Sequence, residues 1–149
     1  MALHSTLEKA FEGKQLLNWA VFEEPGVIET VAGPVFQIFV NICDEWELSV
    51  PQRLKLLGGI IGESTYHNWK SGKSIKMNVA LLERISLILG IYKALNLIFV
   101  NEGKSHEWLA AMNDDAVFAS MSPVHFMLQG PVENLYRTRR YLDAWRGIK

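Results

Sequence analysis

Apolar residues recur along the chain with the spacing of helices. After Pro34, five of them fall at steps of three, one, three and three, which is typical of one face of an amphipathic helix. A longer helix is predicted to begin with Asn78 as its N-cap, because apolar residues from Leu81 to Phe99 repeat at alternating steps of four and three. Further leucines and isoleucines give this second helix another apolar face, so we expect it to be buried on two sides, with a break at Gly90.

Capping and breaking residues delimit shorter helices between and after these two. Ser49 is the predicted N-cap of a helix over 51–57, which the glycines at 58–59 would end. A helix over about 63–70 would end at the serine and glycine of 71–72. The last third predicts three more helices: one over about 104–112, a short one with Ser122 as its N-cap, and one from about 132 to Trp145.

The first 33 residues carry weaker signals. They predict a short helix over 7–19 and loops around 24–26 and 33–34. No segment of the chain alternates between apolar and polar residues as a strand would. We therefore predict an all-α protein, with an acidic lead-in over 1–33, a first helical domain over 34–78 and a second over 79–149, the long buried helix joining the two domains.

Charge is unevenly distributed along the chain. Its 149 residues are 49% hydrophobic and carry a formal net charge of -1, which argues against a protein that coats nucleic acid. Residues 1–48, however, hold eight acidic and two basic residues, whereas 49–76 hold five basic residues and one acidic residue. The basic middle segment is therefore the part of the chain suited to an anionic partner.

Location is predicted from three features. Cys43 is the single cysteine, so an intramolecular disulfide is excluded and a buried core role is expected. The N-terminus lacks the basic start and apolar stretch of a secretory signal. The apolar run over 85–100 is interrupted by polar residues and is shorter than a membrane span of about 18 apolar residues. We expect a cytoplasmic protein that does not bind membrane.

The two short helices over 51–57 and 63–70 match a helix-turn-helix, whose second helix enters the major groove of DNA. Tyr66 and Trp69 lie three apart and would face inward. The polar residues between them would face outward toward base edges, and nearby lysines would meet phosphates. A small polar surface helix without DNA contact is the alternative. The candidate base-contacting residues are Ser64, Thr65, His67, Asn68 and Lys70, and the candidate phosphate contacts are Lys73 and Lys76.

Catalytic and cofactor motifs find no support in the sequence. Residues 71–74 resemble the end of a phosphate-binding loop, but His67 stands where that motif needs a glycine. The four histidines lack metal-ligand spacing, and no Gly-x-Ser-x-Gly element is present. We therefore expect no enzyme activity, no metal and no cofactor.

The C-terminal run over 136–146 combines arginines with aromatic residues, which are enriched at protein interfaces. A solvated basic helix face that packs through Leu142 and Trp145 is an equally good interpretation. A third and weaker interpretation is that this run makes a second contact with DNA.

Several segments together resemble the Xre/MbcA/ParS family of bacterial antitoxins. They are Leu56–Gly59, Ser64–Gly72, Leu82–Leu95, Trp108-Leu109, Asn113, Ser122-Pro123, Met127-Leu128, Gly130 and Arg139–Gly147. The likeness covers about 34–149 and is specific in the long helix and the C-terminus. It implies an Xre-like helix-turn-helix and a C-terminal domain that binds a toxin of the RES class, which degrades NAD, together with repression of the pair's own promoter.

Carried over by position, the resemblance implies that DNA is read by Ser64, Thr65, His67, Asn68 and Lys70. Its toxin-facing residues are Arg137, Arg139, Arg140, Trp145 and Arg146. The turn over 58–62 is longer than a helix-turn-helix normally has, and 1–33 has no counterpart. We expect a homodimer that binds operator DNA and a cognate RES toxin. A stand-alone helix-turn-helix regulator, whose C-terminal domain senses or oligomerises, is the alternative.

Overall fold

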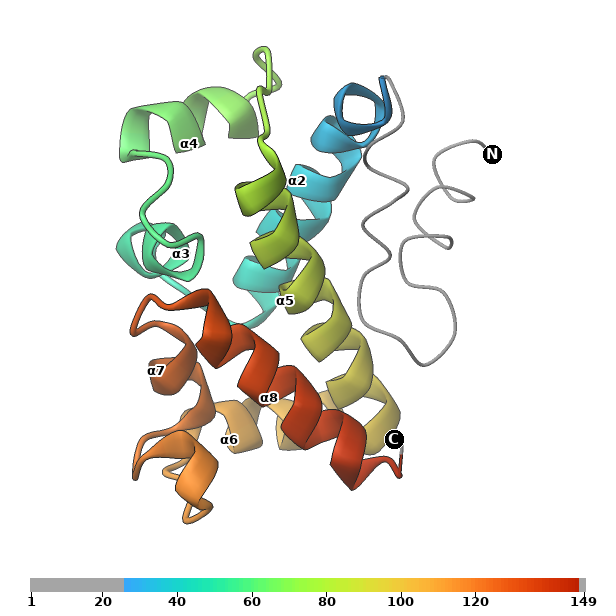
Figure 1. Ribbon diagram of the computed structural model, residues 1–149, viewed down its shortest axis with the longest axis vertical. Coiled ribbons are helices and arrows are strands. Elements are labelled where there is room, and N and C mark those ends of the chain that lie inside the picture. The colour runs from blue at the N-terminus through green and yellow to red at the C-terminus, as the bar shows by residue number, and fades with distance from the viewer. Residues whose placement is uncertain (1–25, 148–149) are drawn as a thin grey trace.

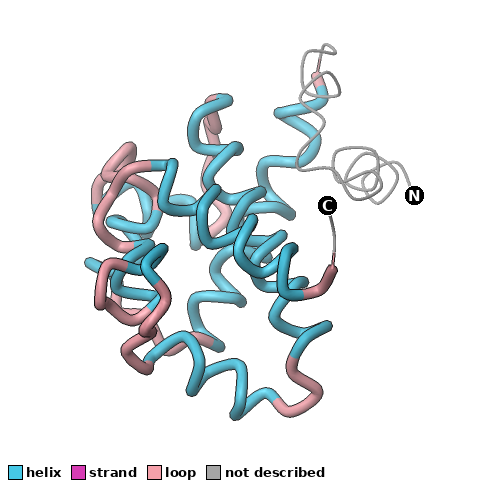
Figure 2. Tube along the Cα trace, turned by 60° about the horizontal axis from the view of Figure 1, so that its bottom comes forward, coloured by secondary structure: helices cyan, strands magenta, loops and turns pink. Residues whose placement is uncertain are grey.

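Residues 26–147 are described in the computed structural model of the chain (Figure 1). Across this range the backbone forms helices and loops and no strand (Figure 2), so the predicted all-α class is confirmed for the described residues. The predicted helix over 7–19 lies outside them. The elements are α2 Val27–Glu45, α3 Val50–Leu56, α4 Glu63–Lys70, α5 Val79–Ile98, α6 Glu102–Ala110, the 3-10 helix η2 Ala116–Phe118, α7 Pro123–Met127 and α8 Val132–Trp145.

Helix α5 is the central element of the fold. In Figure 1, α2 lies beside its first half, with α3 and α4 at one side, while α8 packs along its second half near α6 and α7. Ten of its twenty residues are buried. The buried residues of α2, α5 and α8 belong to one continuous apolar core. The expected burial of α5 on two sides is confirmed, because one helix face meets α2 and another meets α8.

The predicted break at Gly90 is absent, and the reason is a close approach from α8. Helix α5 runs without interruption from Val79 to Ile98. A Cβ atom at Gly90 would lie 1.6 Å from Nη1 of Arg139, so only glycine leaves room for that guanidinium. Gly90 therefore serves helix packing and does not act as a helix breaker.

Helix α2 begins earlier than the sequence pattern predicts. The predicted loop at 33–34 is wrong, because Gly33 and Pro34 lie inside a helix that starts at Val27. A proline inside a helix costs about 3 kcal/mol, since it removes a backbone hydrogen bond. Burial of Val31, Val35 and neighbouring side chains in the core offsets this cost. The predicted boundary between lead-in and first domain thus falls inside one helix.

By length and composition α2 is also the one helix among the described residues that is apolar enough to cross a membrane. Its apolar face packs into the core of the fold, where Phe36 and Phe39 are 1% and 0% exposed. Core helices of soluble proteins can have the same length and apolar composition.

Three predicted caps are confirmed in the structure. Ser49 accepts a hydrogen bond from the backbone N–H of Gln52, whose side chain accepts one in return, which forms a capping box at α3. Asn78 caps α5 by accepting from the N–H of Leu81 at 2.8 Å. Ser122 caps α7 by accepting from the N–H of His125 at 3.2 Å. Each cap satisfies a backbone donor that the first helical turn leaves unpaired.

Cys43 lies on the buried face of α2 and is fully covered. Burial raises the pKa of its thiol to about 12, against an ordinary value of 9.0. At neutral pH the thiol is therefore uncharged and a poor nucleophile, which fits the expected core role.

Candidate nucleic-acid interface and partner surface

Helix α4 presents one buried face and one exposed polar face. Tyr66 and Trp69 are 0% and 7% exposed, as their spacing predicts. Both rings meet Phe36 of α2, at centroid distances of 5.7 Å and 5.5 Å. The opposite face carries the residues predicted to read DNA. Ser64, His67, Asn68 and Lys70 are exposed, and Thr65 is half-buried.

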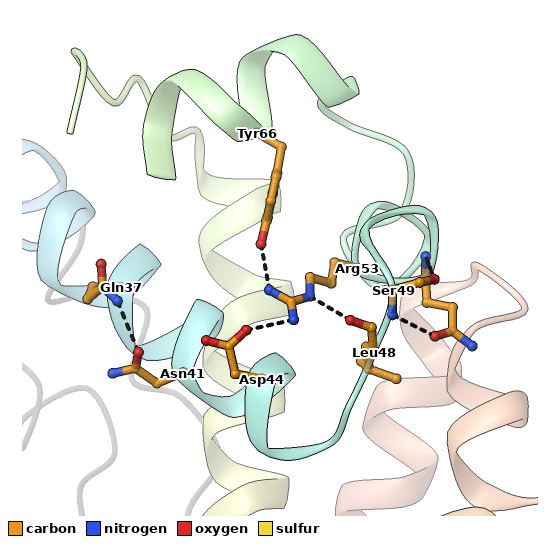
Figure 3. Close-up of polar contacts among 8 residues, drawn as sticks. Gln37, Asn41, Asp44, Leu48, Ser49, Arg53 and Tyr66 are labelled. Carbon is orange, nitrogen blue, oxygen red and sulfur yellow. Dashed lines mark hydrogen bonds and ion pairs between the residues drawn. The ribbon is translucent and has the colours of Figure 1, made fainter. Parts of the chain in front are cut away.

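A buried arginine fixes the position of α4 relative to α2 and α3. The guanidinium of Arg53 donates to the carbonyl oxygen of Leu48 at 2.9 Å, to the hydroxyl of Tyr66 at 2.9 Å and to the carboxylate of Asp44 at 2.7 Å (Figure 3). Burial by itself lowers the pKa of Arg53, but the hydrogen bonds to Tyr66 and Asp44 outweigh it and raise the pKa above its ordinary value. Arg53 therefore stays charged and ties three elements together.

Arg53 also changes the charge inventory of the basic middle segment. The sequence counts five basic residues over 49–76, but the guanidinium of Arg53 is buried and paired with Asp44. Four exposed lysines carry the remaining positive charge: Lys55 on α3, Lys70 at the end of α4, and Lys73 and Lys76 just beyond it. The acidic Glu63 lies 3.5 Å from His67, on the same helix. The surface available to an anion is therefore smaller and lies mostly at the C-terminal end of α4.

The long turn between α3 and α4 begins with an ordered glycine motif. Gly58 N–H donates to the carbonyl of Lys55 at 2.8 Å and Gly59 N–H to that of Leu54 at 2.9 Å. This is the Schellman pattern that ends helices, and both glycines have positive φ angles, of 74° and 70°. α3 ends at Leu56 and α4 begins at Glu63, so the connection is longer than the 3–4 residues typical of a helix-turn-helix.

A second arginine links this turn to the C-terminal helices. Arg84 of α5 donates to the carbonyl oxygen of Gly130 at 2.6 Å and approaches that of Leu56 at 3.5 Å. Its burial lowers the pKa of the guanidinium. A Cβ atom at Gly58 would lie 2.3 Å from Cζ of Arg84, so a glycine is needed there for space as well as for its φ angle.

The C-terminal arginines divide into exposed and buried residues. Arg137 and Arg140 are exposed on α8. Arg139 is 9% exposed, and its Nε donates to both carboxylate oxygens of Asp143, at 3.1 Å and 3.0 Å. Arg146 is half-buried and lies 3.7 Å from Asp143. The expected toxin-facing role of Arg139 is therefore replaced by a structural one, because its guanidinium is enclosed between Gly90 and Asp143.

Trp145 joins an aromatic cluster at the end of α8. Its ring meets Phe99 at 5.5 Å and Trp108 at 6.2 Å, measured between centroids. Nevertheless 49% of the residue is exposed. Trp145 is thus held by ring contacts on one side and exposed to solvent on the other, as aromatic residues at protein interfaces often are. Phe118, which follows the polar loop at 113–115, is buried and belongs to the same cluster. Its ring lies 5.0 Å from that of Tyr141, centroid to centroid.

Sequence reasoning missed Arg53 and Arg84 as organising residues. Arg53 was counted only as positive charge, and Arg84 entered only as part of the segment Leu82–Leu95 that carries the family resemblance. A signal was available for Arg139, since Asp143 follows it by four residues and the buried Leu135 and Leu142 lie on the same helix face. Among residues 26–147, no group of three or more histidine, cysteine, aspartate or glutamate side chains could hold a metal ion.

One curated relative covers most of both chains. The uncharacterized protein y4oB of Sinorhizobium fredii is 41% identical over 112 residues, which is 74% of this chain and 83% of the relative. The chain belongs to the same family as y4oB. No protein-family model matches the chain, and no solved structure matches it.

Proposed function

We propose that the chain is an antitoxin that binds and blocks a RES-type, NAD-degrading toxin and represses its own operon. In this proposal α3 and α4 form an Xre-like helix-turn-helix within 34–78, 79–149 bind the toxin, and α5 joins the two parts. The observation that carries the DNA-binding half is the exposed polar face of α4, which Arg53 and the ring contacts of Tyr66 and Trp69 hold in a fixed position. The resemblance to Xre/MbcA/ParS antitoxins supports the toxin-binding half.

DNA contact would combine base reading with phosphate binding. The amide of Asn68 can donate to and accept from a base edge, and adenine is its best partner. Ser64 and Thr65 lie four and three residues before Asn68 and so share its side of α4, where they can reach neighbouring bases, and His67 is exposed beside Asn68. Lys70 at the end of α4, and Lys73 and Lys76 in the loop beyond it, suit phosphate oxygens. A homodimer would place two such helices on successive turns of a two-fold operator.

The proposed toxin surface lies on the outer side of α8. Arg137 and Arg140 are three residues apart and exposed, so their guanidinium groups project from neighbouring positions of one helix face. Guanidinium groups bind carboxylates through paired hydrogen bonds, and Trp145 adds apolar contact area. An acidic surface on the toxin is the complement expected. We place the complex in the cytoplasm and assign the chain no catalysis and no cofactor.

Asn68→Ala and Lys73→Ala test the DNA interface in different ways. Asn68→Ala removes a base contact, so we expect operator affinity to fall by about 1–3 kcal/mol and base preference to relax at one position. Lys73→Ala removes a phosphate contact, so we expect weaker binding to all sequences and a salt dependence reduced by about one ion. Gel-shift titration on the promoter DNA upstream of the gene, at several salt concentrations, measures both effects.

Two exposed residues away from α4 provide matched controls. Asn41→Ala on α2 removes an exposed amide, and Lys104→Ala on α6 removes an exposed charge. Both variants should bind operator like the unmodified protein. Operator binding by Asn68→Ala that equals that of the unmodified protein would contradict the proposed reading of bases by α4.

The partner surface is tested by the double substitution Arg137→Ala with Arg140→Ala. We expect toxin affinity to fall by about 100-fold or more, since each of the two hydrogen bonds between charged groups contributes about 1.5–3 kcal/mol. The readouts are co-purification with the RES protein encoded next to the gene, and rescue of growth and cellular NAD on co-expression. DNA binding and unfolding should not change. Full rescue by the double variant would overturn the assignment to α8.

A truncation before Arg137 is unsuitable for this purpose. It would remove Leu142, which is fully buried, together with the Arg139 and Asp143 ion pair. Loss of rescue would then report unfolding and not a lost contact. Surface substitutions keep the core intact.

A stand-alone helix-turn-helix regulator is the second candidate. The geometry of α4 favours it equally, because that geometry requires no toxin. A protein that shifts promoter DNA and has no neighbouring RES gene would support this alternative, and NAD protection on co-expression would exclude it.

A further inference from the structure

A cavity of about 210 Å³ lies where the C-terminal end of α2 faces α5 and the first turn of α6. It is separate from the outer faces of α4 and α8. Its wall includes Trp46 just after α2, Tyr92 of α5 and Ser105 of α6, so it is built from both predicted domains. The volume corresponds to about seven waters at about 30 Å³ each, which suits a ligand of a few non-hydrogen atoms.

Ser105 contributes a hydroxyl that has no hydrogen-bond partner among residues 26–147. The residue is 9% exposed, and its Oγ is the one buried side-chain polar atom without a hydrogen bond among the described residues. Buried polar atoms in proteins are nearly always satisfied by protein, water or ligand. An oxygen in this position can accept a hydrogen bond from a group inside the cavity.

Two aromatic rings and an amide complete the polar and apolar parts of the wall. The rings of Trp46 and Tyr92 lie 6.4 Å apart, centroid to centroid, at 45°. Faces of tryptophan and tyrosine attract a cation within about 6 Å. Asn96 of α5 adds a side-chain carbonyl, a second candidate acceptor.

The charges around the cavity favour a cation over an anion. Among the described residues, Glu45 lines it and no lysine or arginine does. His106, which also lines it, lies 3.3 Å from the carboxylate of Glu47. A ligand carrying positive charge therefore enters a region with a surplus of carboxylates.

We propose that this cavity binds a small organic cation with a primary ammonium group, of the size of a short alkylamine. The ammonium N–H groups donate to Ser105 Oγ, to Asn96 and to Glu45, while the carbon chain lies against the rings of Trp46 and Tyr92. This inference is independent of the proposed DNA and toxin binding, because it uses none of their residues.

The test is an NMR titration of the full chain, labelled with nitrogen-15, with n-butylammonium chloride at constant ionic strength. The matched ligands are 1-butanol, which has the chain without the charge, and sodium butyrate, which has the opposite charge. We expect saturable shifts of the backbone amides of Gly103, Ser105 and His106 and of the Trp46 indole with the ammonium ligand alone. Equal shifts with 1-butanol, or no saturation with n-butylammonium in the millimolar range, would overturn the proposal.

Two variants locate the bound ammonium. Ser105→Ala should weaken n-butylammonium binding about fivefold, the loss of one hydrogen bond. It should not lower the thermal stability, since the hydroxyl makes no hydrogen bond to the described part of the chain. Glu45→Gln should weaken binding by up to about fivefold. The control Glu133→Gln removes an exposed carboxylate on α8 and should leave binding unchanged. Unchanged affinity in Ser105→Ala, with the fold intact, would exclude this site.

Discussion

Replacement of Arg139 by alanine should lower the free energy of unfolding by about 3–5 kcal/mol, the cost of breaking a buried ion pair. The substitution leaves the buried carboxylate of Asp143 with Arg146, at 3.7 Å, as its remaining cationic neighbour. It also opens space beside Gly90, where the guanidinium is packed. Urea unfolding followed by circular dichroism measures the change.

The neighbouring arginine provides a matched control. Arg140→Ala removes the same chemical group from the same helix, but from an exposed position, so stability should change by no more than about 0.5 kcal/mol. Equal losses in Arg139→Ala and Arg140→Ala would contradict the structural role of Arg139.

Gly90→Ala gives a further check of this packing, because its effect on the free energy of unfolding should change sign when Arg139 is removed. In the unmodified protein the new methyl group displaces the Arg139 guanidinium, and overpacking of this kind costs about 1–3 kcal/mol. In an Arg139→Ala background the obstruction is gone, and alanine should stabilise α5 by up to about 1 kcal/mol relative to glycine. If Gly90→Ala changed the free energy of unfolding in the same direction in both backgrounds, Gly90 and Arg139 would not be coupled.

Arg53→Leu is expected to cost about 2–4 kcal/mol, because it leaves the Leu48 carbonyl and the Tyr66 hydroxyl without their partner and shortens a buried side chain. The lost contact with Asp44 adds less to this cost, since 57% of the Asp44 side chain is exposed and water can solvate it. Urea unfolding measures the loss. Operator binding should also weaken, because α4 loses the hydrogen bond that fixes Tyr66.

Lys55→Ala, on the same helix as Arg53, is the control. Lys55 is exposed, so its removal should change stability by no more than about 0.5 kcal/mol. Tyr66→Phe removes one of the three Arg53 contacts and should cost about 1 kcal/mol. An Arg53→Leu variant as stable as Lys55→Ala would show that the arginine does not organise α4.

Local signals in the sequence were sufficient for most of the helix ends. Ser49, Asn78 and Ser122 were identified as caps because a short polar side chain there can bond to the first turn, an interaction within three residues. The bounds of α4 and the inward orientation of Tyr66 and Trp69 also follow from local spacing. These features depend on neighbours along the chain, so a single sequence contains them.

Features that depend on distant parts of the chain were not predictable in this way. Gly90 was interpreted as a helix break because the guanidinium that needs its space comes from a residue 49 positions later. Pro34 was taken as a boundary because the packing that offsets its cost involves α4 and α5. Arg53 was counted as surface charge, since its contact with Tyr66 on α4 is visible only once the helices are packed.

The shared position of α5 has a consequence for how the molecule folds. Its residues pack against α2 on one side and α8 on the other, and the buried side chains form one core from Val31 to Leu142. A fragment that ended at 78 would expose the apolar face of α2 that packs against α5. A fragment that began at 79 would expose the face of α5 that packs against α2. The two parts of the chain therefore fold and unfold together, so any change in the stability of one alters the population of the other.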